Sequence, residues 1–470
     1  MAKYEIKDGV GIIPEGTTCI EGLAFENCKE LKSIVIPNSV TSIGVCAFYN
    51  CSALKNIEFT DNSQLTEIKG GAFSKCSSLS DITIPNCVKK IGDGAFRDTP
   101  WEERQPDGLI YINKILYKYK GEMAENTNIV IDEGTTAISS QAFSWEWHLN
   151  SVSIPNSVTE IGNHAFHTCK KLTKINIPDN ITKIEDATFN ACPNLTEIRI
   201  PDSVTEIGRE AFHWCSSLIE ILIPDSVTEI GEYAFGGCEK LVSATLPTNL
   251  KKIDLGVFCC CTNLESVELP KNIEYLGGRY DSSLERNGAF GGCSKLKNIM
   301  LNEGLQVIGL RSFKDCKNIE NIKIPTTVTY IGNETFLNCS SLKSIFIPEG
   351  VEEIGFSAFG SCTSLQKIVL PRSLNNLKKS AFKGCTAIKE IIVPTENEAY
   401  IKKQLPKELH PFVKVTTETL VDETPGPVIE YPKQQKPKAT VQPTVKSTTD
   451  KPSKEEPKSF FGRILGLFKK

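Results

Sequence analysis

Cysteine is the residue type with the greatest capacity for chemistry in this chain, and most of its eighteen copies recur at one spacing. Such a row is compatible with metal ligands, with disulfides, or with small buried side chains whose S–H groups donate to backbone carbonyls. Stacked Cβ atoms about 4.8 Å apart exceed the roughly 3.5–4.5 Å of a disulfide, so the sequence favours the buried row. Thirteen cysteines stand three residues after a phenylalanine: Cys28, Cys51, Cys76, Cys169, Cys192, Cys215, Cys238, Cys261, Cys293, Cys316, Cys339, Cys362 and Cys385.

Other groups that could do chemistry are few. Cys259 and Cys260 stand at variable positions and are expected to be exposed, so a reactive thiol there is an alternative to an inert one. Of the five histidines, His164 and His167 could share a face, but both occupy variable positions and no metal site is expected. The sequence holds no phosphate-binding loop, nucleophile elbow or zinc spacing. It therefore predicts neither an enzyme nor a cofactor.

The element that positions the cysteines is a repeat marked by fifteen phenylalanines. Eleven of the fourteen gaps between them are 23 residues long, and a fixed period of this size is typical of a solenoid. A solenoid presents a long surface rather than a catalytic cleft, so binding is the expected function. The phenylalanines are Phe25, Phe48, Phe73, Phe96, Phe143, Phe166, Phe189, Phe212, Phe235, Phe258, Phe290, Phe313, Phe336, Phe359 and Phe382.

One repeat, residues 201–223, predicts the structure of a turn. Alternating isoleucines at 221–223 indicate a strand, which ends at Pro224 because proline lacks the N–H that a continuing strand needs. Residues 204–208 suit a second short extended segment that ends in a tight bend at its glycine. Residues 211–215 suit a single helical or 3-10 turn whose phenylalanine fills the interior.

The repeated pattern Ile-Pro-x-Ser-Val-Thr-x-Ile-Gly-x-x-Ala-Phe-x-x-Cys-x-x-Leu-x-x-Ile-x-Ile resembles the BspA-like subfamily of leucine-rich repeats. The resemblance covers about residues 6–394, and the pattern recurs with little variation at 155–177 and at 325–347. It implies an α/β leucine-rich repeat solenoid, rich in strands, with short helical or 3-10 turns and a curved parallel sheet. It also implies adhesion or protein binding without enzymatic activity, usually at the surface of bacteria or of parasitic protists.

The chain divides into four parts. A cap is expected because an open solenoid end exposes core and strand edge, and a stretch rich in Pro, Lys, Thr and Glu predicts disorder. The parts are a solenoid of about fifteen repeats over 1–394, with a hairpin insertion near 100–128 and a loop insertion near 277–288; a C-terminal cap over 395–415; a disordered linker over 416–459; and an amphipathic helix over 460–470.

The amphipathic segment ends the chain after a basic linker. Such a helix is attracted to anionic lipid, so the sequence favours a membrane surface as its partner. A docking peptide for a partner groove and a segment that folds back on the solenoid are the alternatives. The apolar residues that share one face are Phe460, Phe461, Ile464, Leu465, Leu467 and Phe468.

The two insertions are candidate contact loops, because insertions in solenoids map to one face that is often the binding face. The hairpin carries Tyr111, Tyr117 and Tyr119, which are either architectural residues or contact residues. The second insertion carries Arg279 and Tyr280, and the alternative is that it is a neutral loop, since a loop of this size costs little to accommodate.

The outward row of the strands is the contact row that the family resemblance implies. Towards the C-terminal end it runs Met300, Lys323, Phe346, Val369 and Ile392. The last three are apolar and are expected to face solvent, and an exposed apolar stripe indicates a partner. The alternative is that the cap covers it.

The charge distribution and the lack of targeting features limit the kinds of partner and the locations that the sequence predicts. Residues 433–470 hold ten Lys/Arg and three Asp/Glu, whereas residues 1–432 hold 43 and 54, and an acidic body argues against nucleic acid. The first residues show no signal peptide and no stretch is long enough to span a membrane. Many cysteines without a signal favour a reducing compartment. The expected location is the cytoplasm or a peripheral membrane site, with the cell surface, reached by signal-less export, as the alternative.

The sequence thus predicts a non-enzymatic protein-interaction scaffold that uses the solenoid surface and is tethered through its C-terminal helix. Its ligand is expected to be a protein or a glycan, with an anionic membrane surface bound by the tail. The alternative is a cell-surface adhesin that binds host or matrix proteins.

Overall fold

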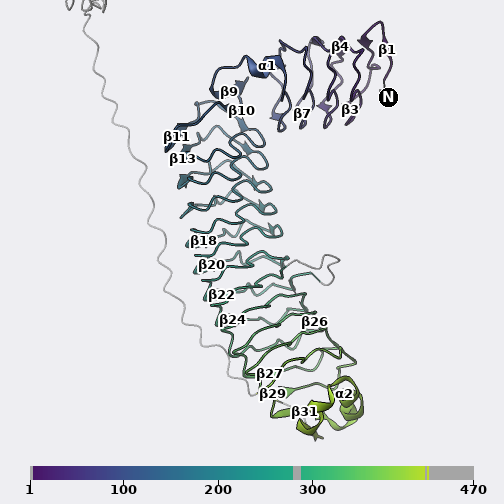
Figure 1. Cartoon of the computed structure of the whole chain (residues 1–470), viewed down its shortest axis with the longest axis vertical. Coiled ribbons are helices and arrows are strands. Elements are labelled where there is room, and N and C mark those ends of the chain that lie inside the picture. The colour runs from purple at the N-terminus through teal and green to yellow at the C-terminus, as the bar shows by residue number, and fades with distance from the viewer. Residues whose placement is uncertain (1–3, 279–286, 419–420, 423–470) are drawn as a thin grey trace, which may run out of the picture. The chain divides into compact units, whose positions relative to one another are not determined.

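The structure, a computed structural model, describes residues 4–278, 287–418 and 421–422. These residues lie within one compact unit, Met1–Ile429. They form a parallel β-solenoid of about 17 turns with little helix (Figure 1). The predicted leucine-rich repeat solenoid is confirmed. Each regular turn contributes two short extended segments and one tight turn, and neighbouring turns are 23 residues apart in register, as in the pair Glu206 and Glu229.

The first strand of each turn belongs to one row of parallel sheets. Its inward side chains are aliphatic and its outward ones vary. The row contains β2 (Val10–Gly11), β4 (Ser33–Ile36), β6 (Asn56–Phe59), β11 (Thr127–Val130), β13 (Leu149–Ser153), β15 (Lys174–Ile175), β18 (Glu220–Leu222), β20 (Ser243–Thr245), β22 (Ser266–Glu268), β24 (Asn298–Met300), β27 (Ser344–Phe346), β29 (Lys367–Val369), β31 (Glu390–Pro394) and β32 (Val413–Thr416). Strand β1 (Ile6–Lys7) pairs antiparallel with β2 and closes the N-terminal end.

The second extended segment forms a second row, as the Val-Thr-x-Ile-Gly pattern predicts. The row contains β3 (Cys19–Ile20), β5 (Ser42–Ile43), β7 (Glu67–Ile68), β8 (Lys90–Ile91), β10 (Ile115–Lys120), β12 (Ala137–Ile138), β14 (Glu160–Ile161), β16 (Lys183–Ile184), β17 (Glu206–Ile207), β19 (Glu229–Ile230), β21 (Lys252–Ile253), β23 (Tyr275–Leu276), β25 (Val307–Ile308), β26 (Tyr330–Ile331), β28 (Glu353–Ile354) and β30 (Asn376–Leu377).

Glycine after this strand allows the turns to approach closely. A Cβ atom at Gly231 would lie 2.5 Å from the backbone nitrogen of Arg209 in the preceding turn, a distance that real Cβ atoms do not reach. The repeated Ile-Gly pair is therefore a packing requirement of the stack.

The phenylalanines form a spine in the core. All fifteen are buried, and consecutive rings, except Phe96 and Phe143, stack nearly parallel with centroids 5.0 to 5.7 Å apart, as in Phe25–Phe48 and Phe290–Phe313. Phe258 and Phe290 still stack at 5.6 Å across the second insertion, so that insertion loops out without disturbing the spine. Each buried phenylalanine contributes roughly 1.5–3 kcal/mol by transfer from water.

The segment around each phenylalanine is a series of tight turns rather than the single helical or 3-10 turn that was expected. The residues two positions before and after it have left-handed backbones, with φ of 56° at Glu210 and 59° at Trp214. These conformations interrupt helical geometry and direct amides towards the next turn. The Phe212 amide, for example, donates to the carbonyl of Ala234 at 2.7 Å.

Among the described residues, the spine is broken once, between Phe96 and Phe143. Here α1 (Pro100–Glu103) and the antiparallel hairpin of β9 (Gly108–Ile112) and β10 replace a regular turn (Figure 1). The aliphatic core correspondingly falls into two clusters that meet at the hairpin. Strands β8 and β10 adjoin but do not pair.

A buried tyrosine seals the end of the N-terminal block. The Tyr117 hydroxyl accepts the Phe96 amide at 3.1 Å and donates to Glu102 Oε1 at 3.3 Å. In a regular turn a carbonyl of the next turn would take the Phe96 amide. Lys118 Nζ lies 3.2 Å from the same Glu102 oxygen, which completes a small polar network at the junction.

The C-terminal end is covered by η1 (Thr395–Asn397), α2 (Glu398–Gln404), η2 (Lys407–Phe412) and β32. Ile401 and Leu409 are buried in the cap and join the core cluster. Strand β32 pairs in parallel with β31, so the last regular strand does not present an open edge.

Candidate functional site

The cysteine row is a set of buried neutral thiols, as favoured from the sequence. The Cys215 thiol donates to the carbonyl of Phe189 in the preceding turn at 3.2 Å, and the same bond recurs from Cys51 to Cys385 with lengths of 2.9 to 3.4 Å. Burial raises the pKa of the Cys238 thiol to about 12. The row therefore links turns together through buried thiols. Its last member differs, because a hydrogen bond with the Cys362 thiol lowers the pKa of Cys385, although its side chain is buried.

The two adjacent cysteines outside the row differ from the expectation that both are exposed. Cys259 is buried, because its side chain turns into the close contact beside Gly236. Cys260 is half-buried, and its pKa is lowered to about 7 by hydrogen bonds from the Cys259 thiol and from the Asn287 amide. Cys260 is thus the more reactive thiol of the pair.

The outward strand row is less exposed near the C-terminus than the sequence suggested. Met300 and Lys323 are exposed, whereas Phe346 and Ile392 are half-buried. Val369 is 7% exposed, because it lies in register between Phe346 and Ile392 and both side chains cover it. The expectation of three consecutive solvent-facing apolar residues is wrong for Val369.

The insertion residues have separate placements. Tyr117 is buried in the junction, so the architectural alternative describes it. Tyr111 is half-buried and its hydroxyl accepts the Asp132 amide at 3.1 Å. Tyr119 is half-buried and lies against the core. The candidate contacts Arg279 and Tyr280, and the tail residues Phe460, Phe461, Ile464, Leu465, Leu467 and Phe468, lie outside the described residues.

An exposed aromatic edge was missed in the sequence analysis. Trp145 and Trp214 each stand two residues after a phenylalanine, three turns apart, and are 60% and 47% exposed. The same position in the two intervening turns holds the small residues Thr168 and Ala191. The two indoles therefore stand about 15 Å apart along the stack, and the surface between them carries only small side chains at this position.

Imidazoles and a third indole extend this aromatic edge. His167 packs edge-on against Trp145 at 5.4 Å between ring centroids, and His213 lies 5.4 Å from Trp214. Trp147 is also exposed, with Lys170 Nζ 4.2 Å from its ring centroid. Burial lowers the pKa values of His167 and His213. The two imidazoles are consequently neutral at neutral pH, and Lys170 adds a charged group to the aromatic edge.

The available sequence signal for this edge was the position of the tryptophans within the repeat. A large aromatic residue two places after the buried phenylalanine cannot enter a core that the phenylalanine already fills. Ile219, Leu222 and Val242 are exposed aliphatic side chains in the turn of Trp214 and in the turn after it. Six large exposed apolar residues thus lie between residues 145 and 242, and a second group of five lies between residues 10 and 45.

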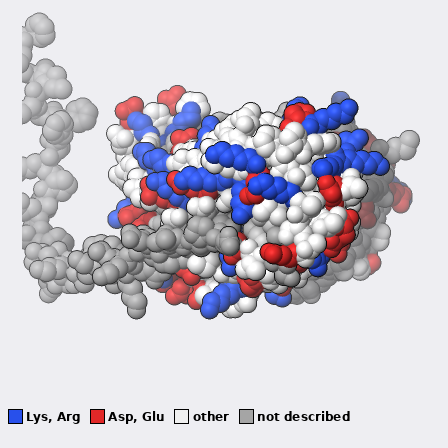
Figure 2. All heavy atoms as spheres, turned by 90° about the horizontal axis from the view of Figure 1, so that it is seen from below, with Lys and Arg blue, Asp and Glu red and all other residues white. Residues whose placement is uncertain are grey.

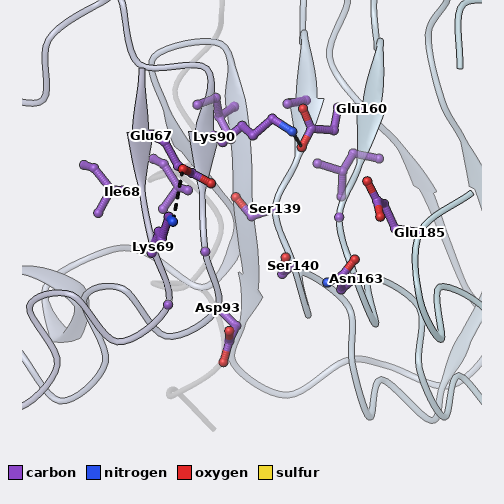
Figure 3. Close-up of a pocket in the computed structure, with 17 residues that line it drawn as sticks. Glu67, Ile68, Lys69, Lys90, Asp93, Ser139, Ser140, Glu160, Asn163 and Glu185 are labelled. Atoms are coloured by element: carbon purple, nitrogen blue, oxygen red, sulfur yellow. Dashed lines mark ion pairs between the residues drawn. The ribbon is translucent and has the colours of Figure 1, made fainter. Parts of the chain in front are cut away.

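A hollow of about 250 Å3 lies in the second strand row, where β8 and β10 fail to pair (Figure 3). Strand β12 and the residues after it line its floor with the short side chains of Ala137, Ser139 and Ser140. Lys90 extends from β8 across this gap, and its Nζ lies 2.7 Å from Glu160 Oε1 on β14. The pair spans two turns that carry no charge at the corresponding positions, Ile115 and Ala137.

The lining of the hollow around the Lys90 side chain is acidic. Its lining contains the carboxylates Glu67, Asp93, Glu160 and Glu185 and the ammonium groups of Lys69 and Lys90, a net charge of −2. The hydrogen bond to Glu160, and then the charges of Glu185 and Glu67, raise the pKa of Lys90. The Ser139 hydroxyl is buried and has no hydrogen-bond partner among the described residues.

The C-terminal end of the solenoid, the last turns together with the cap, has the opposite charge balance. Residues 367–418 hold ten Lys/Arg and five Asp/Glu. Figure 2 shows this end of the molecule, with basic side chains spread between acidic and uncharged ones. Residues 367–418 are therefore a mildly basic end on an otherwise acidic solenoid.

No helix among the described residues is long and apolar enough to cross a membrane. Over the same ranges, no group of three or more His, Cys, Asp or Glu side chains has the arrangement of a metal site.

Comparison with sequence families gives one match over most of the chain. The family described as "BspA type Leucine rich repeat region (6 copies)" matches residues 11–122, 116–204, 183–280 and 285–405. A comparison with curated proteins finds no significant match.

Solved structures of bacterial leucine-rich repeat proteins are similar to the chain. A leucine-rich repeat protein from Bacteroides ovatus is 25% identical with a TM-score of 0.53, over 87% of this chain and 94% of that one. A leucine-rich cell surface protein from Faecalibacterium prausnitzii is 25% identical with a TM-score of 0.32, over 80% and 82%. A leucine-rich repeat protein from Eubacterium ventriosum is 20% identical with a TM-score of 0.34, over 81% and 92%.

Proposed function

The chain belongs to the BspA-type leucine-rich repeat family, and we propose that it is a non-enzymatic scaffold that binds a protein through the side of its solenoid. The surface we assign to this partner is the aromatic edge formed by Trp145, Trp147, Trp214 and their neighbouring histidines. A protein is favoured over a glycan because exposed aliphatic side chains, Ile219 and Leu222, belong to the same turn as Trp214.

The observation that carries the proposal is the exposure of three of the four tryptophans on a solenoid whose core is otherwise closed. Exposed apolar patches mark interaction sites, and tryptophan is enriched among the residues that dominate binding energy. The small side chains of Thr168 and Ala191 would leave room for a protruding side chain of the partner between the two indoles.

The test is recovery of partners from the native cell by the full chain, with quantitative mass spectrometry. We expect the unmodified chain to retain a partner protein specifically. A Trp145→Ser/Trp214→Ser double variant should retain at least tenfold less of that protein. A Phe356→Ser variant is the matched control, since Phe356 is a large exposed aromatic residue on the distant part of the stack. Equal retention by all three proteins would remove the aromatic edge as the binding surface.

The second part of the proposal is that the tail tethers the scaffold to an anionic membrane surface. The predicted apolar face and basic flank of residues 460–470 support it, and the basic end of the solenoid, residues 367–418, supports it independently because it would favour the same surface. The location we propose is therefore a peripheral membrane site within the cell. Signal-less export to the cell surface remains the competing location for an adhesin.

Sedimentation with vesicles containing anionic phospholipid tests the tether. The full chain is expected to sediment with them and a chain ending at residue 458 to stay in solution, whereas neither should bind neutral vesicles. Equal sedimentation of both chains would remove the tail from this role. Protease labelling of intact cells separates the two locations, because only an exported protein is cleaved.

A further inference from the structure

The acidic hollow between β8 and β14 already holds one cation, and that cation comes from the chain itself. Lys90 leaves its own strand, crosses two turns and reaches Glu160 at 2.7 Å. Its side chain is half exposed to solvent, so it is not locked in place by packing. An exposed ion pair of this kind contributes little to stability, about 0–1 kcal/mol.

The surroundings of the Lys90 ammonium have a geometry that suits ligand recognition. Carboxylates from three different turns, Glu67, Glu160 and Glu185, act on it together. Figure 3 shows these groups arranged around the hollow rather than along one strand. On the regular part of the row, Lys252 instead pairs with Asp254 of its own turn at 3.0 Å, and neither residue lines the hollow.

A second observation points to a ligand independently of charge. Ser139 is 4% exposed, and its hydroxyl lines the hollow without a hydrogen-bond partner. Figure 3 shows this oxygen directed towards the side of Glu67 and Lys90. Buried polar groups without partners are uncommon and costly, so an unused hydroxyl in a hollow calls for a partner that arrives from outside.

We propose that this hollow binds the ammonium group of a lysine side chain presented by a basic segment of a partner protein. Lys90 occupies that position in the free chain and is displaced into solvent when the partner lysine enters. Glu160 then accepts the incoming ammonium, and the Ser139 hydroxyl gains its missing hydrogen bond. The inference rests on the proposed function only in taking a protein as the partner.

The experiment uses the competition between Lys90 and the incoming lysine for the carboxylate of Glu160. The probe is a short synthetic peptide of glycine and lysine, titrated calorimetrically into the full chain, and its counterpart has norleucine in place of each lysine. Removing the internal competitor with Lys90→Ala is expected to tighten binding of the lysine peptide at least tenfold. Adding Glu160→Gln to that variant is expected to abolish the gain, and the norleucine peptide should not bind either protein.

The matched control is Lys252→Ala, which frees the carboxylate of Asp254 away from the hollow. It is expected to leave peptide binding unchanged. An equal gain in Lys252→Ala and Lys90→Ala, or no gain in Lys90→Ala, would overturn the proposal. The Trp145→Ser/Trp214→Ser variant should bind the peptide as the unmodified chain does, so failure of the aromatic edge and failure of this hollow are distinguishable.

Discussion

The stack from Phe143 to Phe382 and the junction between Phe96 and Phe143 solve the same packing problem in different ways. In the long stack every phenylalanine ring packs against another. The amide of each phenylalanine from Phe143 to Phe359 donates to a carbonyl of the next turn. At the junction the next ring is absent, and the side chains of Trp101 and Tyr117 take over both tasks.

The difference shows where a repeat protein has room for specific chemistry. In the regular turns each position is defined by its neighbours above and below, so substitutions there act on the fold. At the junction the second strand row is interrupted, and polar groups such as Ser139 and Lys90 lie outside the repeated pattern of contacts. The hollow follows from the interruption.

The largest expected effect comes from breaking the long stack in its middle. Phe212 is held between two rings at 5.3 and 5.2 Å, so Phe212→Ala leaves a cavity that the rigid neighbours cannot fill. We expect the free energy of unfolding, from urea denaturation, to fall by about 3–5 kcal/mol. The exposed Phe356→Ala should cost less than about 1 kcal/mol. Equal effects of the two substitutions would contradict an interior spine.

A smaller and more local effect is expected at the junction. Tyr117→Phe leaves the buried Phe96 amide without an acceptor, which costs about 1–3 kcal/mol. Because the two core clusters meet there, hydrogen exchange should accelerate for the amides of the N-terminal block and stay unchanged beyond Phe143. Tyr119→Phe is the control, since no hydrogen bond of that hydroxyl is found among the described residues. Uniform acceleration along the chain would contradict a two-part core.

The smallest effect concerns the thiols and leaves stability unchanged. Cys260 should react with iodoacetamide faster than the thiols of the buried row, with a rate that rises with pH and levels off above about 7, because the thiolate is the nucleophile. Cys215 and its equivalents should stay unmodified in the native chain. Mass spectrometry of the modified peptides measures both. Rapid modification of every cysteine would show that the buried row is accessible.

Much of the fold is predictable because identical packing contacts recur. The phenylalanine, cysteine and Ile-Gly positions each correspond to one repeated interior contact, so their spacing predicted the two strand rows and the buried thiols. The left-handed residues were not predictable, since Glu210 and Trp214 adopt these conformations only because the next turn accepts their amides.

The site was less predictable because exposure depends on neighbouring turns. Val369 is buried by residues 23 positions before and after it, which a pattern of outward positions cannot reveal. The hollow depends on the path of the hairpin and on the reach of Lys90 across it. Trp145 and Trp214 carried a usable signal, since their position beside a filled core slot implies an outward ring.

Protection of tryptophan side chains in a complex tests the central claim most directly, namely that the aromatic edge, and not the buried repeat, binds the partner. Hydroxyl-radical footprinting would compare the free chain with the complex that it forms with the partner protein recovered from the native cell. We predict that oxidation of Trp145, Trp147 and Trp214 falls on binding while oxidation of the half-buried Trp101 is unchanged. Unaltered oxidation of the three exposed indoles in the complex would contradict the account.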